Sequence, residues 1–153
     1  MNDSMSGTAA PAALVPALLV THGGLGAALL GAARAIAGAF EGVESLSNDD
    51  LSRDALVAAV GERIAAFGPA GGIVFADVAG GSCAQAALSA AARGAPGPVR
   101  VLSGVNLPMV LDYLHNRTRL EPAALADHVL ARGRSSVQLL EAPAAGPDGG
   151  GAA

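Results

Sequence analysis

The stretch Leu18-Leu19-Val20-Thr21-His22-Gly23-Gly24 decides how this chain folds. An apolar run from Val15 to Thr21 stops at a histidine, and two glycines follow. A continuous apolar run of this length is typical of a central strand that is covered on both faces of a parallel sheet. Ligands of such sheets gather outside the carboxyl ends of the strands. The stretch therefore predicts that His22 stands at the ligand-binding edge of an α/β sheet.

Strand-like and helix-like segments alternate on either side of this stretch. Strands are predicted at residues 15–21, 43–46, 73–76 and 99–102. Helices are predicted from apolar spacing over 29–40 and 56–67, and then over 82–93, 107–116 and 122–132. The residues 48–50 are N-cap candidates for the second helix. This rhythm predicts an α/β fold with a doubly wound, mainly parallel sheet, right-handed crossovers and helices on both faces.

The predicted strand order is 2-1-3-4, which makes the first and third strands neighbours. His22 and Asp77 each follow one of these two strands, so we expect them at the same edge of the sheet. The folded unit is predicted to span residues 15–141, as one domain. Residues 1–14 and 142–153 have too little apolar bulk to offset the entropy of ordering them, and they are predicted to be a disordered leader and a disordered tail.

Composition narrows the class of protein. The net charge is −4, all nine basic residues are Arg, and no stretch concentrates them, which disfavours nucleic-acid binding. The single cysteine, Cys83, excludes an intramolecular disulfide and fits a reducing compartment. The apolar stretch Ala9–Val20 has no positive segment before it and is too short to span a bilayer. We therefore expect a cytoplasmic protein.

The polar residues at the strand ends suggest a reactive imidazole beside an anion site. A carboxylate bonded to one imidazole nitrogen fixes the tautomer and leaves the other nitrogen as a nucleophile or base, and Asp77 is the candidate partner of His22. The turn Gly80-Gly81-Ser82 opens a helix, and the N–H groups of a helix N-terminus bind anions. Ser82 fits a phosphate contact and an N-cap equally well at this stage.

Other chemistries fit the sequence less well. The chain contains no lysine and hence no phosphate-binding Gly-Lys-Ser/Thr loop, so no nucleotide or other cofactor is expected. Ser82 does not stand in the Gly-x-Ser-x-Gly turn of many hydrolases. His22, His115 and His128 lack the spacing of metal ligands, and Cys83 stands alone, so no metal site is predicted and the thiol is expected to pack as an apolar side chain. His115 and His128 are expected on the surface.

Three motifs resemble one family. They are Thr21-His22-Gly23, Asp77-x-x-Gly80-Gly81-Ser82 and Gly104-Val105-Asn106-Leu107-Pro108-Met109. In this order they resemble the signatures of the mannose-type EIIA domains of the bacterial phosphoenolpyruvate:sugar phosphotransferase system. The similarity extends over about residues 15–141 and includes the late Gly133-Arg134-Ser135-Ser136-Val137 stretch. The Gly-Val-Asn-Leu-Pro-Met run is its most specific part.

The resemblance implies a phosphohistidine carrier, which is a phosphotransferase. His22 would accept a phosphoryl group from the small carrier protein HPr and pass it to an EIIB protein, in sugar uptake or its regulation. Asp77 would orient the imidazole, while Ser82 and the backbone of Gly80 and Gly81 would hold the phosphoryl oxygens. The residues implied at the rim or in partner contact are Thr21, Gly23, Gly24 and Asn106.

The resemblance also implies a homodimer in which a short final strand is exchanged between subunits, with Val137–Leu140 as the candidate strand. Contact with the membrane would be indirect, through a permease complex.

The chain departs from the family pattern in two places. Ala79 stands where an aromatic residue is common, and Cys83-Ala84-Gln85 replaces a Pro-x-Asn segment. The aromatic residue would help to form the partner-docking surface. These departures leave open a regulatory phosphoacceptor, in which phosphorylation of His22 controls binding to a partner protein. They also leave open a scaffold that no longer carries phosphate.

Overall fold

Four parallel strands form the centre of the structure, in the predicted order. The computed structural model describes residues 13–146. Strand β1 (Ala17–Thr21) lies between β2 (Val43–Ser47) and β3 (Gly72–Ala76), and β4 (Val99–Leu102) lies beyond β3. All three neighbouring pairs are parallel. The order β2-β1-β3-β4 confirms that β1 and β3 are neighbours.

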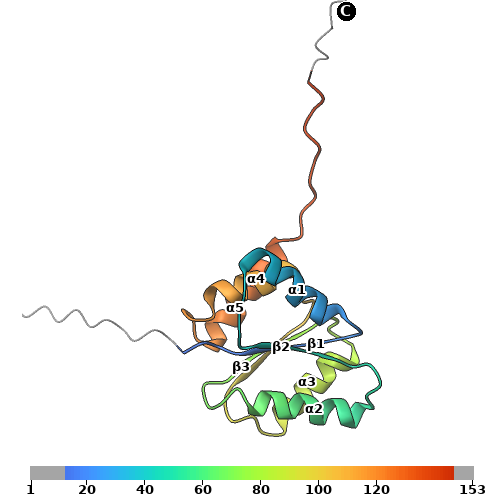
Figure 1. Ribbon diagram of the computed structural model, residues 1–153, viewed down its shortest axis with the longest axis vertical. Helices are drawn as coiled ribbons and strands as arrows, with labels where there is room; N and C mark the ends of the chain where they lie inside the picture. The colour runs from blue at the N-terminus through green and yellow to red at the C-terminus, as the bar shows by residue number, and fades with distance from the viewer. Residues whose placement is uncertain (1–12, 147–153) are drawn as a thin grey trace, which may run out of the picture.

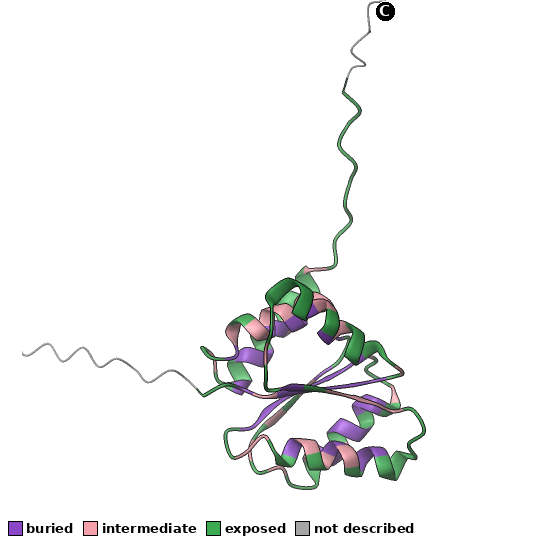
Figure 2. Ribbon diagram, viewed as in Figure 1, coloured by how far each residue is buried: buried purple, intermediate pink, exposed green. Residues whose placement is uncertain are grey.

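The helices form two layers, one on each face of the sheet (Figure 1). Helices α1 (Leu25–Ala37), α4 (Leu107–Asn116) and α5 (Pro122–Ser135) cover one face, and α2 (Arg53–Ala65) and α3 (Ser82–Ala92) cover the other. Successive side chains of a strand point to opposite faces. Leu19 accordingly packs in the first layer, and Leu18 and Val20 pack in the second. Figure 2 shows the buried residues concentrated on the strands and on the helix sides that face them.

Some element ends differ from the predicted ones. Helix α2 begins after Ser52, whose hydroxyl accepts a hydrogen bond from the Ala55 N–H at 3.1 Å. The prediction of an N-cap at residues 48–50 was therefore wrong. Helix α1 ends at Ala37, before Gly38 at φ 81°, so it stops short of residue 40. Apolar spacing over 29–40 predicted that Ile36 would face the core, but this residue is 63% exposed.

The segment 137–140 does not form the expected final strand within this chain. The described residues contain four strands, and this segment leaves the end of α5 and runs away from the sheet (Figure 1). Its large apolar residues are 80–91% exposed: Val137 (80%), Leu139 (91%) and Leu140 (83%). A strand requires the edge of another strand as its partner, and the path of α5 does not bring this segment back to β2 or β4.

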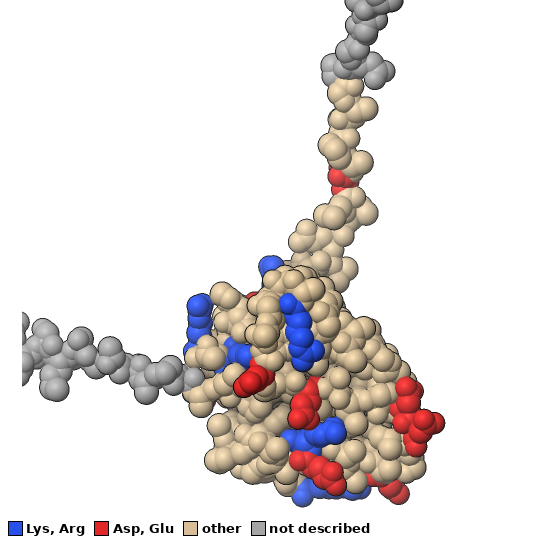
Figure 3. Space-filling model, viewed as in Figure 1, with Lys and Arg blue, Asp and Glu red and all other residues tan. Residues whose placement is uncertain are grey.

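Two further observations concern the ends and the surface. Residues 1–12 and 147–153, which include most of the predicted leader and tail, lie outside the described residues. None of the helices within residues 13–146 combines the length and the apolar character needed to cross a membrane. Acidic and basic side chains are interspersed on the face seen in Figure 3.

Candidate functional site

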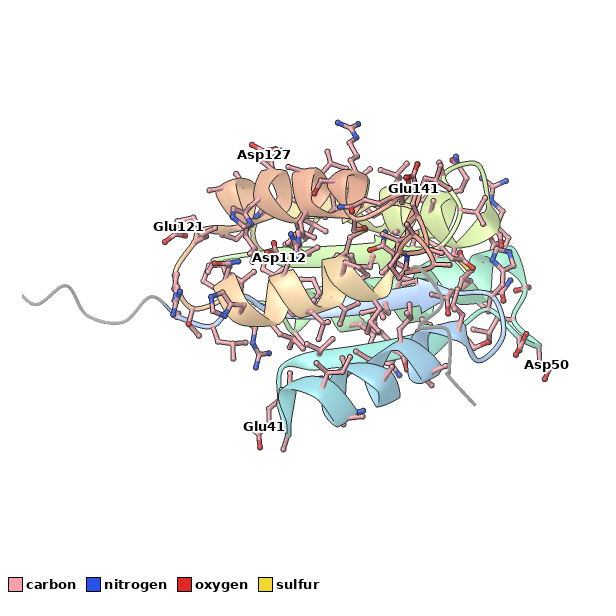
Figure 4. All side chains as sticks on the ribbon, turned by 90° about the horizontal axis from the view of Figure 1, so that it is seen from above. Glu41, Asp50, Asp112, Glu121, Asp127 and Glu141 are labelled. Atoms are coloured by element: carbon pink, nitrogen blue, oxygen red, sulfur yellow. The ribbon has the colours of Figure 1, made fainter. Side chains whose placement is uncertain are left out.

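The site lies where β1, β2 and β3 end. His22 follows β1 directly and Asp77 follows β3 directly, and these strands pair with Val20 opposite Ala76. The Asn48 N–H donates a hydrogen bond to the Thr21 carbonyl at 3.1 Å, which ties the loop after β2 to the end of β1. Figure 4 shows Asp50, in that same loop, at the opposite end of the molecule from Glu121.

His22 and Asp77 form a doubly bonded pair. The backbone N–H of His22 donates to Oδ2 of Asp77 at 2.9 Å, and the ring Nδ1 lies 2.8 Å from the same oxygen. The other oxygen, Oδ1, accepts from the Val78 N–H at 3.0 Å. The Asp77 side chain is only 8% exposed, whereas 49% of the His22 side chain is exposed. The carboxylate is thus fixed inside the site, and the imidazole faces solvent.

The protonation of Asp77 follows from these contacts. Burial acts to raise the pKa of Asp77, but hydrogen bonds from the backbone and ring of His22, and from its own backbone, outweigh it. The net result is a pKa below the ordinary value of 3.8. An ionised carboxylate only accepts hydrogen bonds, so the proton of the neutral ring is assigned to Nδ1. Nε2 then carries the free lone pair.

Ser82 and Asn48 stand beside Nε2. The Ser82 hydroxyl oxygen is 3.5 Å from Nε2 of His22, and Nδ2 of Asn48 donates to that hydroxyl at 3.4 Å. The N-cap of α3 is Gly81 and not Ser82, and no side chain caps this helix. The alternative that Ser82 serves as the N-cap is therefore wrong. Asn48 and Ser82 also line a hollow of about 260 Å³, together with Arg53 and Gln85.

Gly81 lies close to the His22 ring, but its backbone N–H is already hydrogen-bonded and is not free to bind a ligand. Its N–H donates to the Val78 carbonyl at 3.1 Å and closes the turn before α3. A Cβ atom on Gly81 would lie 3.2 Å from Cε1 of His22, whereas one on Gly80 would meet nothing within 4 Å. The first N–H groups of a helix have no partner in its own ladder. At this edge they belong to Ser82 and Cys83, which begin α3.

Cys83 belongs to the site more closely than the sequence indicated. Its Sγ lies 3.8 Å from Nδ1 of His22, and the residue is fully buried, packed against α2 and the sheet. Burial, and then the negative charge of Asp77, raise the pKa of this thiol above its ordinary value of 9.0. The ligand atoms of His22, Asp77 and Cys83 all lie within 4.8 Å of one another, so these three residues are able to hold a metal ion.

The residues expected at the rim have structural roles in the turns and helix starts around the site. Thr21 is 1% exposed, and its hydroxyl accepts from the Gly26 N–H at 2.8 Å, so it anchors the start of α1. Gly23 turns the chain with φ 54°, a conformation that glycine adopts readily, and Gly24 is the N-cap of α1. Asn106 is the N-cap of α4, where its side-chain oxygen accepts from the Met109 N–H at 3.0 Å.

A second His–Asp pair lies away from this edge. Nδ1 of His128 on α5 is 2.7 Å from Oδ2 of Asp112 on α4, and 52% of the His128 side chain is exposed. His115, also exposed, is 3.2 Å from a guanidinium nitrogen of Arg119. The pair of His128 and Asp112 reproduces the distance between His22 and Asp77. It therefore serves below as an internal control.

The roles of Asn48 and Cys83 were not predicted from the sequence, although two signals pointed to them. Asn48 follows β2, which neighbours β1 in the predicted order, so its loop had to reach the same edge. Cys83 begins the buried stripe Cys83, Ala86, Ala87 and Ala90 of α3, and that stripe faces the sheet. Helical phase therefore turns the thiol toward the sheet, at the end where His22 lies.

Fold and site together define a class of protein: a doubly wound parallel α/β domain with a carboxylate-bound imidazole at its strand ends. The EIIA-man family model, described as "PTS system fructose IIA component", matches residues 17–130. The chain belongs to this mannose-type EIIA family, and the resemblance deduced from the motifs is confirmed. It is thus an EIIA component of a phosphotransferase system.

Solved structures share the fold. Component EIIA from Streptococcus agalactiae is 23% identical, with a TM-score of 0.76, and the match covers 82% of this chain and 96% of that one. The mannose/sorbose-specific IIA subunit from Enterococcus faecalis is 23% identical, with a TM-score of 0.73 over 88% of this chain and 100% of that one. A sigma-54 interaction domain protein from Enterococcus faecalis is 12% identical, with a TM-score of 0.64 over 81% and 93%. No curated protein sequence matches the chain.

Proposed function

We propose that Nε2 of His22 accepts a phosphoryl group from the phosphohistidine of an HPr-like carrier and passes it to an EIIB protein. One observation carries this proposal: Asp77 binds Nδ1 and leaves the exposed Nε2 beside Ser82. Membership of the EIIA-man family supports the same reaction. The proposal places the protein in the cytoplasm, in contact with a membrane only through its partners.

The chemistry needs an aligned nucleophile and little else. The Nε2 lone pair attacks phosphorus in line, the P–N bond of the donor breaks, and the donor imidazole keeps that electron pair. The proton on Nδ1 remains between the ring and Asp77, so the carboxylate offsets the positive charge that develops on the ring. Transfer to EIIB is the same step with the roles exchanged. Such transfer depends mainly on positioning and on preorganised donors.

Neutral donors surround the position of the phosphoryl oxygens. They are the Ser82 hydroxyl, the Asn48 amide and the N–H groups of Ser82 and Cys83 at the start of α3. The one basic side chain that lines the adjoining hollow is that of Arg53. A group that has to be handed on is better held by neutral donors than by a cationic clamp, because a clamp would slow its release.

The rim offers an apolar docking surface. Leu25, Leu51 and Val78 follow β1, β2 and β3 respectively, and they are 42%, 38% and 55% exposed. Exposed apolar side chains grouped around a reactive residue are typical of a protein-binding surface. This surface supports a protein as the phosphoryl donor and acceptor, although Ala79 supplies none of the aromatic contact common in the family.

We also propose the homodimer, with residues 137–140 of each subunit added as a strand to the sheet of the other. The apolar side chains of this segment are largely exposed in the single chain. Pairing with an edge strand of a second copy would cover both the segment and the edge.

The test is phosphorylation in vitro with phosphoenolpyruvate, EI and HPr. The wild-type chain should give a phosphoprotein that is labile in acid and stable in base, and His22→Ala should abolish it. His128→Ala is the matched control, because it removes a histidine with the same Asp contact and should leave labelling unchanged. Labelling that persists in His22→Ala, or that disappears in His128→Ala, contradicts the assignment.

A second candidate is a regulatory phosphoacceptor whose state controls binding to another protein. The replaced positions Ala79 and Cys83-Ala84-Gln85 favour it, because two of them, Ala79 and Gln85, are exposed and would alter the surface that a partner meets. The sigma-54 interaction domain protein among the structural relatives is named for a role other than sugar uptake. Adding the EIIB protein encoded nearest to this chain separates the two. Rapid loss of the label favours the carrier, and a label that remains while a partner binds favours the regulatory module.

A further inference from the structure

Three side chains of the site form a set of metal ligands. Nδ1 of His22 lies 2.8 Å from Oδ2 of Asp77 and 3.8 Å from Sγ of Cys83, and all three ligand atoms lie within 4.8 Å of one another. Imidazole, carboxylate and thiolate are the ligand types that Zn²⁺ takes in proteins, often with water in the fourth position. We propose that His22, Asp77 and Cys83 bind Zn²⁺, and that the bound ion switches off the nucleophile at Nε2.

The three ligand atoms reach the spacing of a tetrahedral ion after their side chains shift. With bond lengths of about 2.0 Å to nitrogen and 2.3 Å to sulfur, a tetrahedral ion separates N and O ligands by about 3.3 Å, and N and S ligands by about 3.5 Å. His22 must therefore move away from Asp77 by about half an ångström and slightly toward Cys83. The His22 side chain is 49% exposed and is free to make that movement. Oδ2 of Asp77 and Sγ of Cys83 lie within 4.8 Å of each other and have to come to about 3.5 Å, which requires rotation about their own side-chain bonds.

The thiol distinguishes this cluster from the other His–Asp pair. His128 and Asp112 have the same nitrogen-to-oxygen contact, at 2.7 Å, but no cysteine lies beside them. Within residues 13–146, His22, Asp77 and Cys83 are the one group of three or more ligand side chains that lie this close. Soft thiolate ligands select Zn²⁺ over the harder cations Mg²⁺ and Ca²⁺. We therefore expect the metal to distinguish between the two pairs.

Binding at Nδ1 inactivates Nε2 through the tautomer of the ring. In the free site Nδ1 carries the proton that Asp77 accepts, and Nε2 carries the lone pair. When Zn²⁺ occupies Nδ1, the proton of the neutral imidazole moves to Nε2, and the lone pair there is lost. The thiol of Cys83 releases its proton to the buffer as it becomes a thiolate. The net change is one Zn²⁺ bound and about one proton released per site.

Helical phase places the thiol at this position. Cys83 is the second residue of α3, on the buried stripe that faces the sheet. The inhibitory effect of Zn²⁺ rests on the phosphoryl transfer proposed above, whereas metal binding itself does not.

The first experiment measures binding to the unphosphorylated full chain, without any donor. Zn²⁺ is titrated calorimetrically in two buffers of different ionisation enthalpy, and Co²⁺ is titrated while the thiolate-to-metal charge-transfer absorption is followed. The wild type should bind one Zn²⁺ with about one proton released, and Co²⁺ should give the thiolate absorption. Cys83→Ala and His22→Ala should each weaken binding by more than about tenfold, because each removes a ligand. His128→Ala should bind as the wild type does.

The second experiment follows phosphorylation by purified phospho-HPr, with and without Zn²⁺, and compares each variant with itself in chelator. Zn²⁺ should slow the wild type and His128→Ala by more than about tenfold and leave the rate of Cys83→Ala nearly unchanged. If Zn²⁺ inhibits all three chains equally, it acts on the phospho-HPr donor. The proposal that Zn²⁺ switches off Nε2 of His22 is then overturned. Absence of Zn²⁺ binding, wild-type affinity in a Cys83→Ala chain with native circular dichroism, or absence of the thiolate absorption overturns the metal site. The binding result stands even if no chain is phosphorylated, so the two proposals fail separately.

Discussion

At the scale of single residues, one glycine sets the position of the reactive ring. A Cβ atom on Gly81 would lie 3.2 Å from Cε1 of His22 and 3.3 Å from the Val78 carbonyl oxygen. Contacts this short force one of the neighbours to give way. The carbonyl is part of the turn that Gly81 closes, so the imidazole ring is the group that moves. The absence of a side chain at Gly81 therefore keeps Nε2 near Ser82.

We predict that Gly81→Ala slows phosphorylation by on the order of tenfold and changes stability little. A displacement of about 1 Å at a reacting group costs on the order of 10²-fold in rate, and a few tenths of an ångström costs less. The backbone of Gly81, at φ −82° and ψ 167°, suits alanine without strain. Rapid-quench kinetics with phospho-HPr gives the rate, and urea unfolding gives the stability.

Gly80→Ala is the matched control, because a Cβ atom there meets nothing within 4 Å. It should retain the wild-type rate. If both substitutions slow phosphorylation equally, the cause is the reduced flexibility of the turn. The contact between Gly81 and His22 would then not be the cause.

The sequence was sufficient to bring His22 and Asp77 together, because each follows an apolar run and the runs belong to neighbouring strands. The sequence did not decide between a phosphate contact and an N-cap for Ser82. The structure excludes the N-cap, because Gly81 occupies that position. The contact between Cys83 and His22 depends on the phase of α3 and on the rotamer of the ring, to within a few tenths of an ångström. Spacing along a chain carries no such precision.

At the scale of elements, the close packing of α4 against α5 depends on a glycine, because a side chain at that position would meet the other helix. A Cβ atom on Gly133 of α5 would lie 2.6 Å from Cγ and 2.7 Å from Sδ of Met109 on α4. Met109 is 2% exposed and has little room to move. The late glycine of the sequence motif thus serves the packing of two helices.

We predict that Gly133→Ala destabilises the fold by about 1 kcal/mol or more. Overpacking a core costs about 1–3 kcal/mol, and the gain in helix propensity from glycine to alanine is about 1 kcal/mol at most. The clash therefore prevails. Urea unfolding followed by circular dichroism measures the change.

Gly31→Ala serves for comparison, since Gly31 is an exposed position within α1 where a Cβ atom meets nothing within 4 Å. It should stabilise the chain by about 0.5–1 kcal/mol. If Gly133→Ala is also stabilising, Met109 adapts freely and the tight contact has no energetic role.

Element types and order were predictable because apolar period and length differ between buried strands and amphipathic helices. The fourth strand, at Val99–Leu102, has the predicted bounds. Helix ends were less predictable, since a cap is decided by one hydrogen bond. Ser52 caps α2, whereas the sequence had predicted the cap among residues 48–50.

At the scale of the whole molecule, residues 137–140 expose apolar side chains that a second copy of the chain would cover. A strand alternates its side chains, so Val137 and Leu139 would share one face while Gln138 and Leu140 share the other. Full burial of a large apolar side chain contributes about 1.5–3 kcal/mol. The three exposed apolar residues therefore represent a substantial driving force for association with a second copy.

We predict that truncation after Ser136 converts a dimer into a folded monomer. Loss of the two apolar contacts of Val137 and Leu139, which share one face of the strand, should raise the Kd of the dimer by at least about 10²-fold, at about 1.4 kcal/mol per factor of ten. The domain should keep its native circular dichroism, because 137–140 contributes no residue to the two buried clusters. Sedimentation at several concentrations measures the oligomeric state.

Two single substitutions decide whether the segment associates as a strand. Leu139→Asp places a charge on the face that would enter the sheet contact and should act like the truncation. Gln138→Asp adds the same charge one residue earlier, on the opposite face of a strand, and should leave the dimer intact. Equal effects of the two would mean that the segment associates without the alternation of a strand. A full chain that sediments as a monomer would exclude the exchanged strand, and His22 would then have to function in a single subunit.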